Sequence, residues 1–199
     1  MDPDVQQAVA FHGHMCPGLA IGVRAARYGL REIGSHAQDE EVVALVETDM
    51  CAVDAIQSLM GCTFGKGNLI HKDYGKSAFT LYRRSNGKGV RLVTRPDAFG
   101  PRDPADDEVG KRVREGKGSA EEHESFRELQ ARRTELILTR AEDELFHIEP
   151  VPSGPPQPAR IHRSLTCEDC DESTMETRTR RFGGRTLCIP CFERAEVRA

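Results

Sequence analysis

FHGHMCPGLAIGVRAARYGLREIG, residues 11–34, sets two histidines and a cysteine directly before a helix-forming pattern. Pro17 suits the first turn of a helix, because its missing N–H would have no partner there. Apolar residues then recur at helical spacing as far as Ile33, and Gly34 is a suitable stop. We therefore predict a helix from Pro17 to Ile33. Cys16 would be its N-cap, where the helix dipole favours a thiolate.

His12, His14 and Cys16 occupy alternate positions in this stretch. In an extended chain, alternate side chains project from one face, so these three would point the same way. Imidazole and thiolate are ligands that suit zinc and other late transition metals. The pattern therefore predicts a metal or thiolate site.

A second thiol follows a short apolar run, Val42–Val46, which is typical of a buried strand. Asp49 is a suitable cap for a second helix, predicted from Met50 to Met60. This helix would carry Cys51 in its first turn and Asp54 one turn further on the same face. As a group, these thiols, imidazoles and carboxylates favour metal binding over polar residues that merely satisfy two helix starts. Three protein ligands would leave a position open, as in catalytic zinc sites, with Asp54 or His12 as base or orienting group.

Composition predicts a soluble globular protein, with one sizeable domain and a small one in 199 residues. No apolar run approaches the roughly 20 residues needed to span a bilayer, and residues 1–7 are polar, unlike a secretion signal. We therefore expect a cytoplasmic location. The net charge of −4 provides no overall field that would attract nucleic acid, although it allows a local basic patch.

Weaker patterns fill the rest of the first domain. The glycine-rich stretch 61–68 lacks the spacing of a Walker loop, so we favour a tight turn over phosphate binding. Alternation in 77–84 and the run 90–94 predict two strands, joined at a two-residue Asn86-Gly87 turn. The charged stretch 101–118 shows little pattern.

Ser119 and Glu122 form a capping box for a long helix, predicted to reach about Phe146. Charged residues surround its narrow apolar stripe, which indicates an exposed arm or a dimer contact. The stripe consists of Phe126, Leu129, Leu136, Ile137 and Leu145.

Cys62 lies outside the predicted site. A helix between Cys51 and Cys62 would separate them by about 16 Å at roughly 1.5 Å per residue, too far for one metal or a disulfide. We favour a small buried hydrophobe for Cys62. A site completed across a dimer is the alternative.

Residues 149–163 are rich in proline, which indicates a stiff linker between a core, residues 1–148, and a C-terminal module, residues 164–199. Two C-x-x-C pairs, Cys167/Cys170 and Cys188/Cys191, are 17 residues apart, as in four-cysteine zinc sites. So short a segment cannot build its own core, and zinc would stabilise it. A short helix after the last pair, residues 192–197, suggests a treble clef.

Arginines gather between the two cysteine pairs, at Arg178, Arg180, Arg181 and Arg185. They would suit contact with nucleic acid or with an acidic protein. We favour solvated charge on a finger loop, because charge runs more often mark an exposed surface.

Three stretches resemble the FmdE family of formylmethanofuran dehydrogenase proteins: Phe11 to Gly22, Glu47 to Gln57, and Gly61 to Leu69, followed by Lys72-Asp73-Tyr74-Gly75-Lys76. The C-terminal module is similar to the finger of the TraR/DksA regulators. The resemblance implies an α+β core, with helices on a mostly antiparallel sheet, that forms a homodimer. It implies a metal site with His14, Cys16 and Cys51 as ligands, and His12 and Asp54 beside them. It also implies association with a molybdenum or tungsten enzyme that reduces carbon dioxide.

We consider three functions. The first is an accessory subunit or enzyme of redox or one-carbon metabolism, with zinc or another transition metal in the core. Here Cys16, Cys51, His12 and Asp54 are the candidate catalytic residues. The second is a metal or redox sensor whose finger contacts nucleic acid or a protein partner. The third is a scaffold in which both metal sites are structural. We favour the first, because an open His/Cys site is poorly suited to a purely structural role.

The finger departs from the family pattern at Asp171, which follows Cys170 where the zinc knuckle has glycine. Asp tolerates a positive φ better than most residues do. We therefore expect the knuckle to keep its shape.

Overall fold

The computed structural model describes residues 2–36, 39 and 41–197. It divides into two compact units, Met1–Pro158 and Ala159–Ala199. No helix among the described residues is long and apolar enough to cross a membrane.

The first unit is built on a five-stranded sheet in the order β2-β1-β3-β4-β5. Only β1 and β2 run parallel; the remaining neighbours are antiparallel, which confirms the predicted α+β class with a mostly antiparallel sheet. The strands are β1 (Val42–Val46), β2 (Leu69–His71), β3 (Ala78–Arg83), β4 (Gly89–Thr94) and β5 (Phe146–Pro150).

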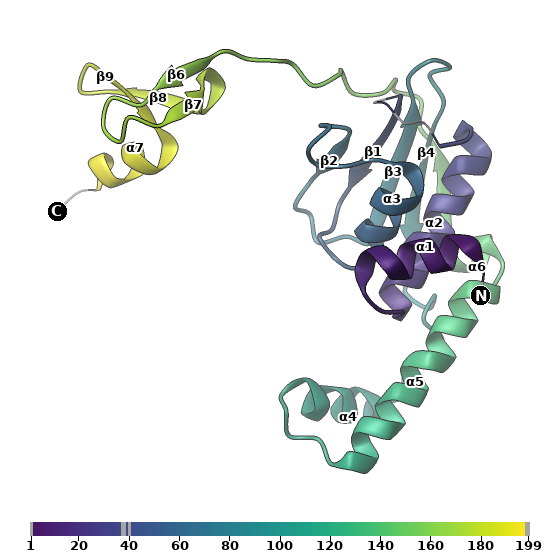
Figure 1. Cartoon of the computed structure of the whole chain (residues 1–199). Coiled ribbons are helices and arrows are strands. Elements are labelled where there is room, and N and C mark those ends of the chain that lie inside the picture. Colours follow the sequence, from purple (N-terminus) through teal and green to yellow (C-terminus); the bar gives the residue numbers. More distant parts are fainter. Residues whose placement is uncertain (1, 37–38, 40, 198–199) are drawn as a thin grey trace. The chain divides into compact units, whose positions relative to one another are not determined.

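Three helices cover one face of this sheet: α1 (Pro3–His12), α2 (Pro17–Ile33) and α3 (Ala52–Met60) (Figure 1). The core lies between them and the sheet, where Leu19, Ile56, Phe79 and Leu81 are buried. The bounds predicted for α2 and β1 are confirmed, because a proline start, a glycine stop and an apolar run are local signals.

The start predicted for α3 is wrong. Asp49 does not cap this helix; Cys51 is the N-cap residue, and its side chain makes no capping bond. Thr48 instead forms a turn, in which its hydroxyl accepts a hydrogen bond from the Met50 amide at 3.3 Å. Cys51 therefore lies just before the first turn of α3 rather than inside it.

The hairpin between β3 and β4 is also longer than predicted. Tyr82 pairs with Gly89, so the loop is residues 84–88 rather than the Asn86-Gly87 dipeptide alone. The Asn86 side chain accepts a hydrogen bond from the Lys88 amide at 2.9 Å, which is an Asx turn within this longer loop.

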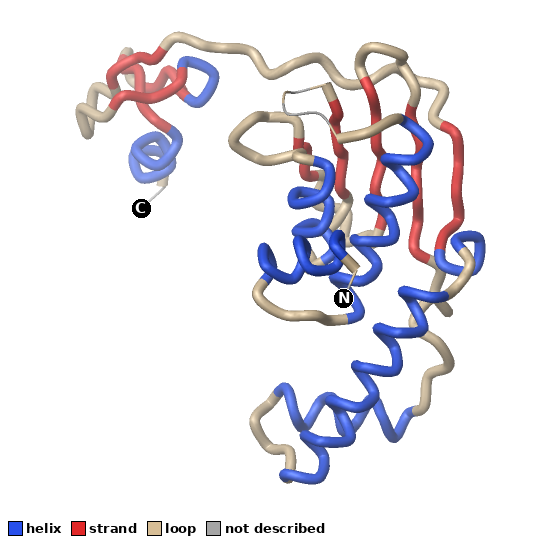
Figure 2. The backbone as a smooth tube through the Cα atoms, turned by 45° about the vertical axis from the view of Figure 1, so that its right-hand side comes forward, coloured by secondary structure: helices blue, strands red, loops and turns tan. Residues whose placement is uncertain are grey.

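Two helices that follow β4 form a hairpin reaching away from the sheet (Figure 2): α4 (Pro104–Arg114) and α5 (Ala120–Thr139). Helix α4 was not predicted from the sequence; its start is capped by Asp103, which accepts from the Ala105 amide at 2.8 Å. The capping box of Ser119 and Glu122 on α5 is confirmed.

The end predicted for this long helix is wrong. Arg140 and Ala141 adopt extended backbone angles, a short helix α6 (Glu142–Leu145) follows, and Phe146 begins β5. Pairing with β4 determines this strand, and such pairing leaves no local signal. The C-terminal end of α5 is fixed to the core, because the buried Arg24 side chain donates to the Ile137 carbonyl at 2.7 Å.

Within residues 159–197, the second unit has two small hairpins and one α-helix. They are β6 (Ser164–Thr166) with β7 (Ser173–Met175), β8 (Thr179–Phe182) with β9 (Arg185–Cys188), the single turn η1 (Glu176–Arg178), and α7 (Ile189–Glu196). Helix α7 begins at Ile189, between Cys188 and Cys191, which is three residues earlier than the predicted start at residue 192.

Candidate metal centre

The first candidate site lies where α2 and α3 begin. Cys16 is the N-cap of α2, and its Sγ accepts a hydrogen bond from the Leu19 amide at 3.3 Å. Cys51 directly precedes α3, but its side chain makes no capping bond there. A helix N-terminus is a favourable place for a negative charge, and the bond from the Leu19 amide adds to this effect at Cys16.

Two glycines of α2 allow the two thiols to meet. A Cβ at Gly22 would lie 2.2 Å from the Ala52 carbonyl oxygen, so only glycine permits this approach of the α2 and α3 backbones. A Cβ at Gly18 would lie 3.3 Å from the Cys51 Cβ, 3.8 Å from the Cys51 Sγ and 3.9 Å from the Cys16 Sγ. The two sulfurs thus face each other across a space that the bare glycine leaves open.

His12 completes the group from a third element. It is the last residue of α1, and Gly13, at φ 97°, turns the chain back toward α2. The predicted extended run from His12 to Cys16 is therefore wrong, because a helix end and a left-handed glycine occupy it. The His12 Nε2 lies 4.0 Å from the Cys16 Sγ, and the ligand atoms of His12, Cys16 and Cys51 all lie within 4.8 Å of one another.

Asp54 orients the imidazole. Its Oδ2 lies 2.6 Å from the His12 Nδ1, and its Oδ1 accepts a hydrogen bond from the Gln57 Nε2 at 3.3 Å. With the proton on Nδ1, the lone pair of Nε2 faces the thiols. A carboxylate that fixes a ligating histidine in this way is common around protein-bound metals.

The structure does not bring His14 into this group. Its exposed ring stacks on His12, with the ring centroids 4.7 Å apart and the planes inclined by 34°. Of the residues proposed from sequence, the fold collects Cys16, Cys51, His12 and Asp54. His14 as a ligand stays a prediction. His12 ends α1 and His14 follows the left-handed turn at Gly13, so the two rings lie in different positions relative to the thiols.

The donor set of this group suits a cation. Burial raises the pKa of the Cys51 thiol, and the nearby Cys16 sulfur raises it further. Two thiolates this close repel each other, and a divalent cation between them would reverse that penalty. Two sulfurs and one imidazole nitrogen are a donor set that zinc favours. The residues therefore fit a late transition metal.

Cys62 lies apart from this group. It is fully buried, and its thiol donates to the Val42 carbonyl at 3.5 Å. Burial raises the pKa of Cys62 to about 12, so it stays a neutral thiol. Its environment agrees with a small buried hydrophobe.

The second candidate site is in the C-terminal unit. The sulfurs of Cys167, Cys170, Cys188 and Cys191 all lie within 4.8 Å of one another, as expected for a tetrahedral zinc. The Cys188 amide donates to the Cys167 Sγ at 3.2 Å and lowers the pKa of that thiol to about 6. Asp171 takes a φ of 60°, so the knuckle keeps its shape without glycine, as predicted.

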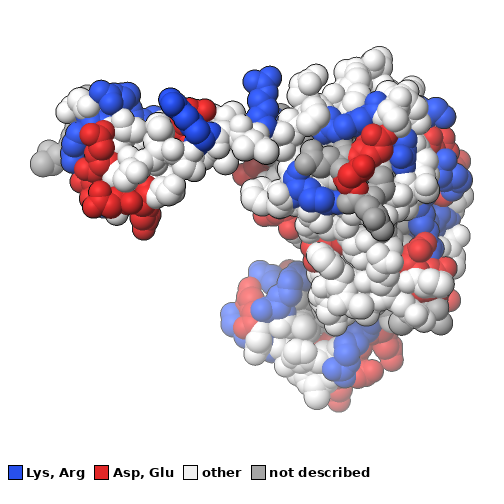
Figure 3. Space-filling view, turned by 45° about the horizontal axis from the view of Figure 1, so that its top comes forward, with Lys and Arg blue, Asp and Glu red and all other residues white. Residues whose placement is uncertain are grey.

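Some arginines of this unit pair with acidic side chains. Arg185 lies 3.2 Å from Asp169, and Arg163 lies 2.7 Å from Glu176. On the face shown in Figure 3, acidic and basic side chains of the unit lie side by side. This mixture favours solvated charge over a surface for nucleic acid.

Comparison with known families matches both units. Residues 11–147 match the family described as "FmdE, Molybdenum formylmethanofuran dehydrogenase operon". Residues 161–197 match the prokaryotic dksA/traR C4-type zinc finger.

Two individual proteins are similar to this chain. A protein of Archaeoglobus fulgidus named "Probable S-adenosyl-L-methionine-binding protein" is 32% identical over 192 residues; the match covers 93% of this chain and 51% of that protein. The chain thus spans about half the length of this curated relative. The crystal structure of a tungsten formylmethanofuran dehydrogenase FmdE-like protein from Syntrophus aciditrophicus has a TM-score of 0.62 at 23% identity. That match covers 98% of this chain and 92% of the other, and it shows a shared fold.

Proposed function

Given that this chain belongs to the FmdE family, we propose that its core holds zinc or another late transition metal through His12, Cys16 and Cys51. One observation carries the proposal: three ligand atoms, from the end of α1 and from the residues directly before α2 and α3, converge within 4.8 Å. His12 replaces His14 as the imidazole ligand, because its Nε2 faces the thiols. Cys167, Cys170, Cys188 and Cys191 hold a separate zinc in the finger.

The core site has three protein ligands and one neighbouring carboxylate. A metal held by these three residues would have room for a further ligand, and it would supply Lewis-acid chemistry to a group or water bound there. Two residues prepare the site for a metal: Asp54 orients the His12 ring, and Gly18 leaves space beside the two sulfurs. This arrangement suits a reactive or exchangeable site better than a closed structural one. We therefore propose a metal-dependent accessory subunit or enzyme of redox or one-carbon metabolism.

The proposed partners follow from the family. Its description names a formylmethanofuran dehydrogenase operon, so a component of a molybdenum or tungsten enzyme is the protein partner we propose. A homodimer is the proposed state of the chain, with the α4–α5 hairpin as its contact, since that hairpin reaches away from the core (Figure 1). Paired thiols at the core site need a reducing compartment, which agrees with a cytoplasmic location.

A second function is a metal-responsive regulator. The finger forms a compact unit of its own and matches a family of prokaryotic C4-type fingers. In this case, the core metal would change the affinity of the finger for a protein or nucleic acid. Binding of the full chain to such a partner, measured with the core site loaded and with Cys16 and Cys51 replaced, separates the two functions.

S-adenosylmethionine is a test ligand rather than the proposed substrate. The archaeal relative's name states that it is a probable binder, but half of that protein lies outside the match. Its binding residues can therefore lie in the half that this chain does not span. Saturable binding of S-adenosylmethionine by the metal-loaded chain would bring that ligand into the proposed function.

Metal content of the full chain tests the core site directly. We expect two metals per chain in protein purified without added metal, and one in the Cys16→Ser/Cys51→Ser double variant. Cys62→Ala is the matched control, because that thiol is buried away from the site, and it should keep both metals. One metal per chain, unchanged by the double substitution, would refute the proposal.

Asp54→Ala should weaken core-metal affinity by roughly 10- to 100-fold, the usual effect of losing a carboxylate that orients a ligating histidine. Asp54→Asn keeps an acceptor for the His12 Nδ1–H but no charge, so its loss should be smaller. Asp49→Ala, at an exposed carboxylate of the same loop, is the control. Competition with a chromophoric chelator measures all four affinities. Equal affinity in wild type and Asp54→Ala would show that Asp54 does not orient a ligand.

A further inference from the structure

A cavity of about 520 Å³ lies directly in front of the two thiols. On one side it is bounded by Cys16, Gly18 and Cys51 at the starts of α2 and α3. On the other side are Gln130 and Arg133 of α5, and Arg114 at the end of α4. Its volume falls within the roughly 300–1,000 Å³ of small-molecule sites. The α4–α5 hairpin thus forms a second wall for the candidate metal centre.

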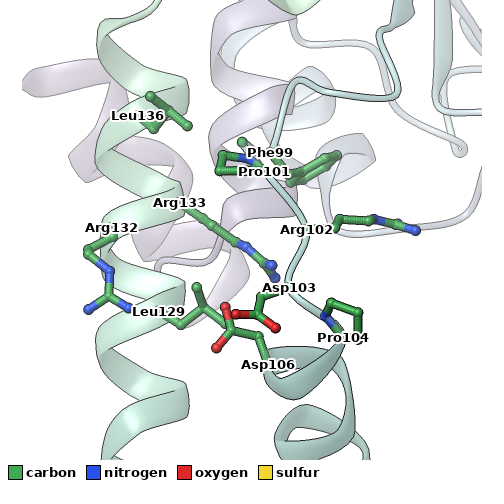
Figure 4. Close-up of a pocket in the computed structure, with 11 residues that line it drawn as sticks. Phe99, Pro101, Arg102, Asp103, Pro104, Asp106, Leu129, Arg132, Arg133 and Leu136 are labelled. Atoms are coloured by element: carbon green, nitrogen blue, oxygen red, sulfur yellow. The ribbon is translucent and has the colours of Figure 1, made fainter.

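Arg133 reaches into this region without a partner. Its Nε is shut off from water and makes no hydrogen bond among the described residues. Figure 4, which draws the adjoining cavity that shares Phe99 and Arg133 with this one, shows the Arg133 side chain leaving α5 toward Pro101 and Asp103, whereas Arg132 points to the other side of the helix. A buried guanidinium N–H with no acceptor is costly, so the site is incomplete as the protein alone provides it.

Arg114 supplies a second unpaired charge. The Arg114 side chain makes no hydrogen bond or ion pair in the described part of the chain, whereas the neighbouring Arg112 pairs with Glu122 and Arg132 with Glu128. Among the described residues, neither arginine that lines the cavity has a protein acceptor for its side chain, unlike nearby arginines on the same two helices.

The lining charge of the cavity is positive. Among its described lining residues there is no carboxylate. The charge of a divalent metal would cancel the charge of the two thiolates, so the net charge around the cavity would be that of the two guanidinium groups. Acidic side chains line the two adjoining cavities instead, at Asp103 and Asp106 in one and at Glu135 in the other, and the Asp103 Oδ1 already caps α4. The field in the cavity therefore favours an anion.

We propose that this cavity binds a small molecule by an oxyanion, either carboxylate or phosphate, held by Arg133 and Arg114 so that the rest of the molecule faces the Cys16–Cys51 site. Arginine suits this role, because its planar fork matches both oxyanions in a bidentate manner. The claim that the bound molecule faces a metal rests on the proposed function. The claim that its oxyanion binds in the cavity depends only on Arg133 and Arg114.

Calorimetric titration of the full, metal-loaded chain with inorganic phosphate and with malonate at constant ionic strength tests this inference. We expect saturable binding of at least one probe. Arg133→Gln and Arg114→Gln should each weaken it by roughly 10- to 100-fold, the effect of losing a charge-assisted hydrogen bond. Arg132→Gln, on the opposite side of α5, should bind as wild type. Saturation by phosphate alone would indicate a phosphorylated ligand, and by malonate alone a carboxylate.

Further variants separate this inference from the metal site. Arg114 is exposed, so Arg114→Gln reports on binding even if Arg133→Gln fails to fold. Anion binding that persists in the Cys16→Ser/Cys51→Ser variant supports the arginine site independently of the metal. No saturable binding of either probe by a chain that holds two metals, or equal affinity in wild type and Arg114→Gln, would overturn the proposal.

Discussion

Removal of zinc from the finger will unfold residues 159–197 and leave the first unit folded. The buried residues described in this unit are Cys167, Leu187, Cys188 and Cys191, so almost all of its interior is the metal site itself. Structural zinc in zinc-finger peptides contributes about 10–16 kcal/mol at neutral pH. A single Cys188→Ser substitution should have the same effect as chelation.

Limited proteolysis of the full chain measures this effect. In Cys188→Ser, cleavage should spread through residues 159–197 while the first unit stays protected, and metal content should fall by one per chain. Ser173→Ala, an exposed position on β7, should match wild type in both. A finger that remains protected in Cys188→Ser would mean that zinc does not stabilise it.

Gly22→Ala should destabilise the first unit by about 3 kcal/mol or more, since overpacking of this kind costs roughly 1–3 kcal/mol and sometimes more. Alanine favours a helix over glycine by up to ~1 kcal/mol, so helix propensity alone predicts the opposite sign. The new Cβ would lie 2.2 Å from the Ala52 carbonyl oxygen, a backbone atom that can move only if α3 moves with it.

The same displacement should weaken the core metal site, because Cys51 directly precedes α3 and would move away from Cys16. Thermal unfolding and metal affinity both measure the change, with a melting temperature lowered by roughly 6–12 °C. Gly65→Ala is the control, since a Cβ there meets nothing within 4 Å. A Gly22→Ala variant as stable as wild type would show that the two helices separate easily.

Local signals in the sequence explain the elements that were predicted well. Pro17 and Gly34 bound α2, and the apolar run Val42–Val46 is β1. The Ser119–Glu122 capping box begins α5. Each of these signals acts between residues that are close in the chain.

Elements that depend on distant contacts were missed or misplaced. Strand β5 exists through its pairing with β4, and no proline or glycine marks the break at Arg140 and Ala141 that precedes it. Helix α4 carries little apolar pattern, because it packs on α5 through Gly110 and Phe126 rather than on the main core. Its helical start is local, at Asp103 and Pro104, and that signal was available in the sequence.

The sequence by itself determined the family and the four finger cysteines, and it predicted a core group that contains Cys16 and Cys51. These depend on residue type and spacing, which the chain displays directly. Only the tertiary structure decided that His12 rather than His14 faces the thiols, and that two unpaired arginines from α4 and α5 lie across a cavity from them. Both results depend on how separate helices meet: Gly13 turns α1 toward α2, and Gly22 lets α2 and α3 touch. These helix–helix contacts depend on packing between segments that are distant in the sequence, and no local sequence pattern encodes them.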